Sequence, residues 1–204
     1  MLAAYIPNPR MRLFTTDMVV ATCILLLFAL FGNHADWVLL TSWVLVFGYL
    51  GYQQRRYALL HQLLSTFFAV CWVSFAKDYY GYQFDYVKIF GMNSLPLMAW
   101  SLTLLGLGEV CNYLNMSKKI YNFLIFVPAF WFFLILFETV AYHVLEIRNT
   151  VTGSFAGLPY CNCIHAPTWM KVVYFSMGPS YYLSTLAADH WIGKWLTKNP
   201  PVSR

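Results

Sequence analysis

Six long apolar stretches constrain the fold of this chain more than any other feature of its sequence. A bilayer hydrocarbon core about 30 Å thick needs about 20 helical residues, and a helix satisfies its backbone polar groups within the segment. The six stretches lie at about residues 13–31, 37–52, 59–76, 87–107, 123–145 and 169–191. We therefore expect an all-α, polytopic integral membrane helix bundle, with residues 1–204 forming a single transmembrane domain.

The composition agrees with a membrane protein and excludes an ordinary soluble domain. Hydrophobic residues make up 60% of the chain and charged residues 10%, whereas soluble domains carry about 25% charged residues. Aromatic residues reach 20%, which suits a protein with many rings at two membrane interfaces. The second stretch is short and Asp17 lies near the start of the first, so a hairpin that dips partway into the bilayer is an alternative for this pair.

The distribution of lysine and arginine predicts the orientation, because short cytoplasmic loops carry an excess of both. With the N-terminus inside, nine basic residues face the cytoplasm: Arg10, Arg12, Arg55, Arg56, Lys118, Lys119, Lys194, Lys198 and Arg204. Four face the outside: Lys77, Lys88, Arg148 and Lys171. We therefore expect both termini in the cytoplasm and an outer loop at residues 146–168, in a multi-pass protein of the bacterial cytoplasmic (inner) membrane.

The net charge of +5 is explained by this topology and predicts no nucleic-acid partner. The expected partners are membrane lipids, and other membrane subunits if the chain belongs to a larger complex.

Polar residues gather at the outer end of the fifth stretch. Glu138, Tyr142 and Glu146 recur every four residues and share one helical face, and His143 lies on an overlapping stripe. Asp, Lys or Arg at the centre of a span costs at least about 2.5 kcal/mol on insertion scales, so ionisable residues in a span usually face a partner or a site. We take Glu138, His143 and Glu146 as candidate catalytic residues. A buried hydrogen-bonded network that holds helices together is the alternative.

The outer loop predicts a lid, because its glycines, prolines and aromatic residues favour a shaped segment that packs on the bundle. The candidate lid and substrate contacts are Tyr142, Tyr160, His165 and Trp169. Cys161, Cys163 and His165 alternate along the loop, which puts their side chains on one side of an extended segment. Three interpretations stay open: a metal site, a disulfide, or two thiols that are free or linked to a partner.

A second polar cluster is predicted at the inner end of the bundle and comprises His61, Glu109, Asp189 and His190. Ordinary interfacial anchoring explains most of it, since charged side chains near an interface reach water at little cost. Glu109 follows an uninterrupted apolar run and needs a partner, which Arg55, Arg56 or His61 could supply.

The chain contains none of the motifs that identify nucleotide-binding, zincin or thioredoxin-like proteins. We expect a membrane-embedded enzyme that acts on a lipid or isoprenoid-like, lipid-soluble substrate by acid–base chemistry at the outer half of the bundle. The alternative is a non-catalytic or cofactor-carrying subunit of a larger membrane complex, with histidines that ligate haem or a chlorophyll-type pigment. Transport ranks third, and the sequence indicates no particular cofactor.

Overall fold

The computed structural model describes residues 9–83, 86–114 and 119–198, and within them six long helices form a bundle. The helices are α1 (Pro9–Leu30), α2 (Ala35–Tyr52), α3 (Arg56–Phe75), α4 (Ser94–Leu114), α5 (Lys119–His143) and α6 (Thr168–Lys198). Two short 3-10 turns, η1 (Gly32–His34) and η2 (Lys77–Tyr79), follow α1 and α3. The prediction of an all-α bundle of membrane type is confirmed.

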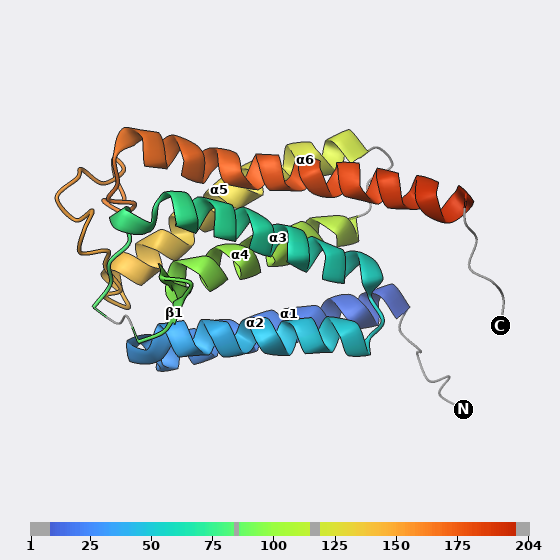
Figure 1. Cartoon of the computed structure of the whole chain (residues 1–204), viewed down its shortest axis with the longest axis horizontal. Helices are drawn as coiled ribbons and strands as arrows, with labels where there is room; N and C mark the ends of the chain where they lie inside the picture. Colours follow the sequence, from blue (N-terminus) through green and yellow to red (C-terminus); the bar gives the residue numbers. More distant parts are fainter. Residues whose placement is uncertain (1–8, 84–85, 115–118, 199–204) are drawn as a thin grey trace, which may run out of the picture.

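All six helices lie roughly along the long axis of the molecule (Figure 1). We call one end the arginine end, because Arg55 and Arg56 lie at the turn between α2 and α3 there. The other is the loop end, where residues 144–167 connect α5 to α6 (Figure 1). Helix α1 begins and α6 ends at the arginine end, as expected for six consecutive crossings. Which side of a membrane this end faces stays a prediction.

Five helical segments are long and apolar enough to cross a membrane. They are Leu13–Leu30, Gly32–Tyr52, Arg56–Phe75, Ser94–Leu114 and Lys119–His143. Helix α6 has 31 residues and packs against α3 and α5, but its serines, threonines and Asp189 make it less apolar, so its crossing stays a prediction. Helices α1 and α2 pack against each other along the bundle, and how far this pair enters a bilayer stays a prediction (Figure 1).

The fourth helix starts later than the sequence predicted, at Ser94 instead of residue 87. Strand β1 (Lys88–Ile89) pairs antiparallel with β2 (Met92–Asn93), and these two strands form a hairpin before the helix. Phe90 and Gly91 at its tip have φ angles of 51° and 77°, which suit the tight turns that join paired strands. The apolar residues before Ser94 therefore belong to a hairpin.

Asp36 attaches this hairpin segment to the start of α2. Its buried carboxylate accepts hydrogen bonds from the backbone N–H groups of Trp37 at 2.9 Å, Tyr86 at 3.0 Å and Val87 at 2.9 Å. Three charge-assisted bonds satisfy a carboxylate that would otherwise be costly to bury. The segment between α3 and α4 is thereby held over the loop end of the bundle.

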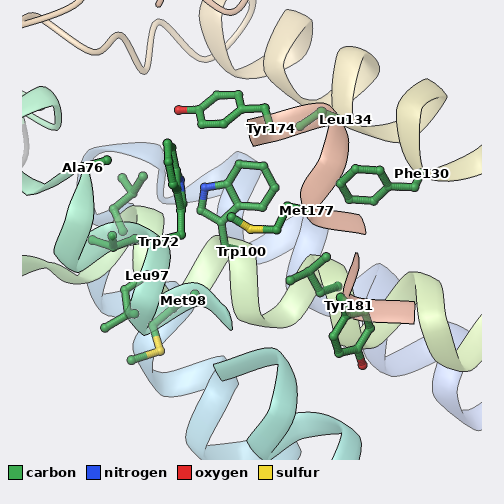
Figure 2. Packing of buried hydrophobic residues seen from close by; sticks show 14 of the residues in the cluster. Trp72, Ala76, Leu97, Met98, Trp100, Phe130, Leu134, Tyr174, Met177 and Tyr181 are labelled. Atoms are coloured by element: carbon green, nitrogen blue, oxygen red, sulfur yellow. The ribbon is translucent and has the colours of Figure 1, made fainter. Parts of the chain in front are cut away.

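The core lies between α3, α4, α5 and α6, where Trp72, Trp100, Tyr174, Met177 and Tyr181 are buried (Figure 2). Large apolar side chains also cover the outer faces of the helices, and many are more than half exposed in the isolated chain. This distribution is typical of a bundle whose outer surface contacts lipid.

Helices α5 and α6 approach each other closely at Gly178. A Cβ atom added to this glycine would overlap the ring of Phe130. The glycine therefore allows the two helices to pack closely at this position.

Candidate functional site

The hydroxyl of Tyr80 is the centre of a hydrogen-bonded cluster at the loop end. It accepts hydrogen bonds from the indole N–H of Trp72 at 2.7 Å and from that of Trp100 at 3.3 Å. Its oxygen lies 2.9 Å from the hydroxyl oxygen of Tyr174, with which it shares a further hydrogen bond. Trp72 comes from α3, Trp100 from α4 and Tyr174 from α6, so this single hydroxyl joins three helices. Figure 2 shows the three rings gathered together in the core.

The rings form a compact aromatic group, which we call the aromatic box: Trp72, Tyr80, Tyr82, Trp100 and Tyr174. Ring centroids lie 4.9 Å apart between Trp100 and Tyr174, 5.6 Å apart between Trp72 and Tyr174, and 6.3 Å apart between Tyr80 and Tyr82. Most of these pairs meet edge to face, the favoured geometry for aromatic rings. The box therefore presents both π faces and hydroxyl groups within one region of the bundle.

Glu138 on α5 is close enough to the aromatic box for its charge to act on Tyr80 and Tyr82. Burial raises the pKa of Tyr80 above its ordinary value, its hydrogen-bond partners lower it in part, and the nearby charge of Glu138 raises it again. Burial likewise raises the pKa of Tyr82, and the charges of Tyr80 and Glu138 add to this effect. Among the described residues, Glu138 makes no hydrogen bond or ion pair. It is thus a carboxyl group on a membrane-type helix without a polar partner in this part of the chain.

The other two candidate catalytic residues do not join Glu138 at the box. His143 is exposed, and its Nε2 atom lies 2.9 Å from the backbone carbonyl oxygen of Cys161. Glu146 is exposed beyond the end of α5, with a φ of 54°. The residues of the predicted polar stripe therefore do not share one site, because Glu138 lies beside the core and His143 is hydrogen-bonded to the loop.

The predicted lid residues occupy three different environments. Tyr142 stacks on His165 with centroids 4.6 Å apart, and the guanidinium group of Arg148 lies 4.9 Å from the centroid of the Tyr142 ring. Trp169 packs edge to face on Trp72 at 6.0 Å and so extends the aromatic box. Tyr160 is fully exposed. Of these residues, Trp169 is the one that contacts the box directly.

The loop of residues 144–167 packs on the bundle through apolar side chains. Ile147, Cys163, Ile164 and Ala166 are buried in the main core. Asn149 donates a side-chain hydrogen bond to the carbonyl oxygen of Tyr79 at 2.7 Å, which ties the loop to the segment after α3. The expectation of a shaped loop over the bundle end is confirmed.

Cys161, Cys163 and His165 are not arranged as a metal site. The two sulfur atoms lie 2.6 Å apart, but the ring nitrogens of His165 lie 2.8 Å and 3.1 Å from the carbonyl oxygens of Phe155 and Asn162. Across residues 9–83, 86–114 and 119–198, no group of three or more His, Cys, Asp or Glu side chains is placed to hold a metal ion. The two thiols therefore lie close together, and the geometry gives no support to a metal site.

A network of ion pairs lies at the arginine end. Arg55 contacts the carboxylate of Asp17 at 2.7 Å and that of Glu109 at 2.8 Å. The Nδ1 atom of His61 lies 2.8 Å from Glu109, and its Nε2 atom lies 3.0 Å from Asp189. Two carboxylates around one imidazole suit its doubly protonated form, since both nitrogens then donate. The network links α1, α3, α4 and α6 through the turn that carries Arg55.

A pocket of about 630 Å³ opens beside this network. Its lining residues are Gln54, Arg55, Arg56, Tyr57, Ala58, His61, Glu109, Asn112 and Asp189. The need of Glu109 for a partner was predicted, and both Arg55 and His61 provide one. His190 is exposed and outside the network. Asp17 was not predicted as a member, and its position within an apolar stretch was the sequence signal that it needed a partner.

Comparisons with protein-family models, with curated proteins and with solved structures found no match for this chain. Its function is therefore inferred from the geometry of two polar regions, which are the aromatic box with Glu138 at the loop end and the network of ion pairs at the arginine end.

Proposed function

We propose that this protein is a membrane-embedded enzyme that acts on a lipid-soluble, isoprenoid-like substrate by acid–base chemistry, with Glu138 as the group that transfers the proton. The observation that carries this proposal is the position of Glu138. Its carboxyl group lies beside the aromatic box and makes no hydrogen bond or ion pair among the described residues. An ionisable group that is retained in such a segment at an energetic cost is a functional-site candidate.

The aromatic box supports an unsaturated hydrocarbon chain as the substrate class. An acid that protonates a carbon–carbon double bond generates a carbocation, and aromatic faces attract cations by about 2 kcal/mol or more when water is excluded. Trp72, Trp100 and Tyr174 supply such faces, while the hydroxyl groups of Tyr80 and Tyr174 supply polar contacts. Isoprenoid chains are rich in double bonds and reach a membrane-embedded site from the bilayer.

The geometry favours Glu138 alone over the pair of Glu138 and His143 as the proton-transfer group. His143 and Glu146 lie at the surface of the loop end, where His143 binds a carbonyl oxygen of the loop. In the proposal these two residues position the loop and do not exchange the proton.

Deuterium transfer from the solvent tests the proposal without knowledge of the net reaction. The purified protein is placed in vesicles that contain a panel of linear polyprenols and conjugated polyenes in D₂O, and deuterium in the C–H positions is measured by mass spectrometry. The wild-type protein should label at least one compound. Glu138→Gln should lower the labelling rate by about 10²-fold or more, since general acid–base catalysis contributes about 10²–10⁴-fold.

The matched control is Asp78→Asn, which removes an exposed carboxylate at the same end of the bundle and should leave the rate unchanged. Glutamine has nearly the volume of glutamate, so thermal unfolding of Glu138→Gln in detergent should match the wild type. Labelling that persists in Glu138→Gln would show that another group transfers the proton. A wild-type protein that labels none of the panel would argue against this substrate class.

The alternative, a haem- or pigment-carrying subunit, has weaker support from the histidines. Both ring nitrogens of His61 contact carboxylates, and both of His165 contact carbonyl oxygens. The absorption spectrum of the purified protein separates the two functions, because a bound haem or chlorin would be visible in it.

A further inference from the structure

The turn that carries Cys161 and Cys163 has an unusual backbone. In an extended segment, two residues separated by one position have Cα atoms about 6.6 Å apart, near the upper limit of about 6.8 Å for a disulfide. Here Tyr160, Asn162 and Ile164 have φ angles of 70°, 46° and 52°, so the chain is folded back on itself. The sulfur atoms consequently lie 2.6 Å apart.

The folded turn is held by its own hydrogen bonds. The N–H of Leu158 donates to the carbonyl oxygen of Cys163 at 2.7 Å, and the N–H of Asn162 donates to that of Leu158 at 2.9 Å. A Cβ atom on Gly157 would lie 2.8 Å from the side-chain oxygen of Asn162. Left-handed conformations are unfavourable for residues other than glycine, so these contacts keep the sulfur atoms together against a backbone preference.

The two thiols differ in their access to solvent. Cys163 is fully buried, whereas Cys161 is partly exposed. Burial and the adjacent Cys161 raise the pKa of Cys163 to about 11, so its thiol is protonated at neutral pH. An incoming reagent therefore meets Cys161 first, and Cys163 is placed to react afterwards.

We propose that Cys161 and Cys163 form a reversible disulfide by exchange with the disulfide of an external oxidant. The sulfur of Cys161 attacks one sulfur of that disulfide, a mixed disulfide forms, and the first thiol of the oxidant leaves with the proton from Cys161. The sulfur of Cys163 then attacks that of Cys161, and the second thiol leaves with the proton from Cys163. The cysteine pair loses two electrons and two protons, and the oxidant gains both.

Thr139 and Glu138 on α5 are close enough to Cys163 to shift the pKa of its thiol. The disulfide would therefore fix the loop against the part of α5 that carries Glu138. The inference rests on the turn alone and does not depend on the proposed enzymatic function. The two are tested by separate measurements, one on the mass of a peptide and the other on transfer of deuterium.

The test uses the full-length protein in detergent. It is reduced, the reductant is removed, and oxidised glutathione is added. Remaining thiols are then blocked with iodoacetamide under denaturing conditions, and the peptide that contains both cysteines is weighed. We expect this peptide two hydrogen masses below the dithiol form and without any alkyl group. Cys23, Cys71 and Cys111 lie in α1, α3 and α4 and should be alkylated throughout, which provides an internal control.

Two variants sharpen the result. In the Cys163→Ser variant the reaction should stop at a glutathione adduct on Cys161, because the second thiol is missing. Gly157→Ala should slow closure by about tenfold or more, because the reaction depends on how closely the reacting atoms are held. A wild-type peptide that carries two alkyl groups after oxidised glutathione would overturn the proposal. A wild-type adduct that persists on Cys161 would also overturn it, since Cys163 would then be unable to displace glutathione.

Discussion

Arg55 shows how much a single side chain contributes at the arginine end. Its guanidinium group lies between the carboxylates of Asp17 and Glu109, and the three side chains are only 13–17% exposed. Asp17 is also hydrogen-bonded by the hydroxyl groups of Tyr49 at 3.0 Å and Tyr113 at 2.7 Å. Loss of the cation would leave Glu109 with His61 and Asp17 with the two tyrosine hydroxyl groups, and neither carboxylate would keep a guanidinium partner.

We therefore expect Arg55→Met to lower the free energy of unfolding by roughly 2–4 kcal/mol, because removal of one partner leaves buried charge uncompensated. Arg56→Met is the matched control, since Arg56 is the next residue and exposed. It should change stability by less than about 0.5 kcal/mol, as surface substitutions usually do. Chemical unfolding in mixed micelles measures both. Equal losses in the two variants would contradict the role assigned to Arg55.

The sequence indicated which residues needed partners at this scale, but only partly which partners they have. The deep position of Glu109 predicted a cation, and Arg55 was among the candidates. Its second carboxylate, Asp17, lies 38 positions earlier in the chain, and this contact depends on how α1 packs in the bundle. The relation of Glu138 to Tyr80 likewise depends on how the segment after α3 folds over the bundle, which hydropathy does not encode.

At the scale of elements, the contact between α5 and α6 depends on the absence of a side chain. Gly178→Ala places a methyl group against the ring of Phe130, and we expect a loss of roughly 1–3 kcal/mol from overpacking. Gly106→Ala in α4 is the control, because a Cβ atom there has nothing within 4 Å. Alanine favours a helix over glycine by about 1 kcal/mol, so this variant should be neutral or slightly more stable. Thermal unfolding in detergent distinguishes the two, and a Gly178→Ala protein as stable as wild type would contradict the packing.

Helix boundaries were predictable where apolar runs end at charged or polar residues. The predicted start at residue 59 compares with an observed start at Arg56, and the predicted end at 52 agrees with the end of α2 at Tyr52. The fourth element was shifted because an apolar hairpin and an apolar helix start look alike in hydropathy. The backbone N–H groups of Tyr86 and Val87 donate hydrogen bonds to Asp36, which belongs to another element, so these bonds were not visible in the local sequence.

At the scale of the whole molecule, the distribution of basic residues predicts that the arginine end faces the cytoplasm. We expect the Ser154→Cys variant to react with a membrane-impermeant maleimide on intact cells. Gln53→Cys, at the turn between α2 and α3, should react only after the membrane is permeabilised. Both are made in a background with Cys161→Ser and Cys163→Ser, so that the loop has no other thiol. The reverse pattern would invert the predicted topology.

Helix α3 takes part in both polar regions, with His61 near one end and Trp72 near the other. These residues are eleven positions apart, which is about 16 Å along a helix. Helix α3 is thus restrained near both of its ends. A rotation about its axis or a shift along it would strain the hydrogen bonds to Glu109 and Asp189 at one end and the bond to Tyr80 at the other. We therefore expect a displacement of α3 at the ion pairs of the arginine end to shift the rings of the aromatic box as well.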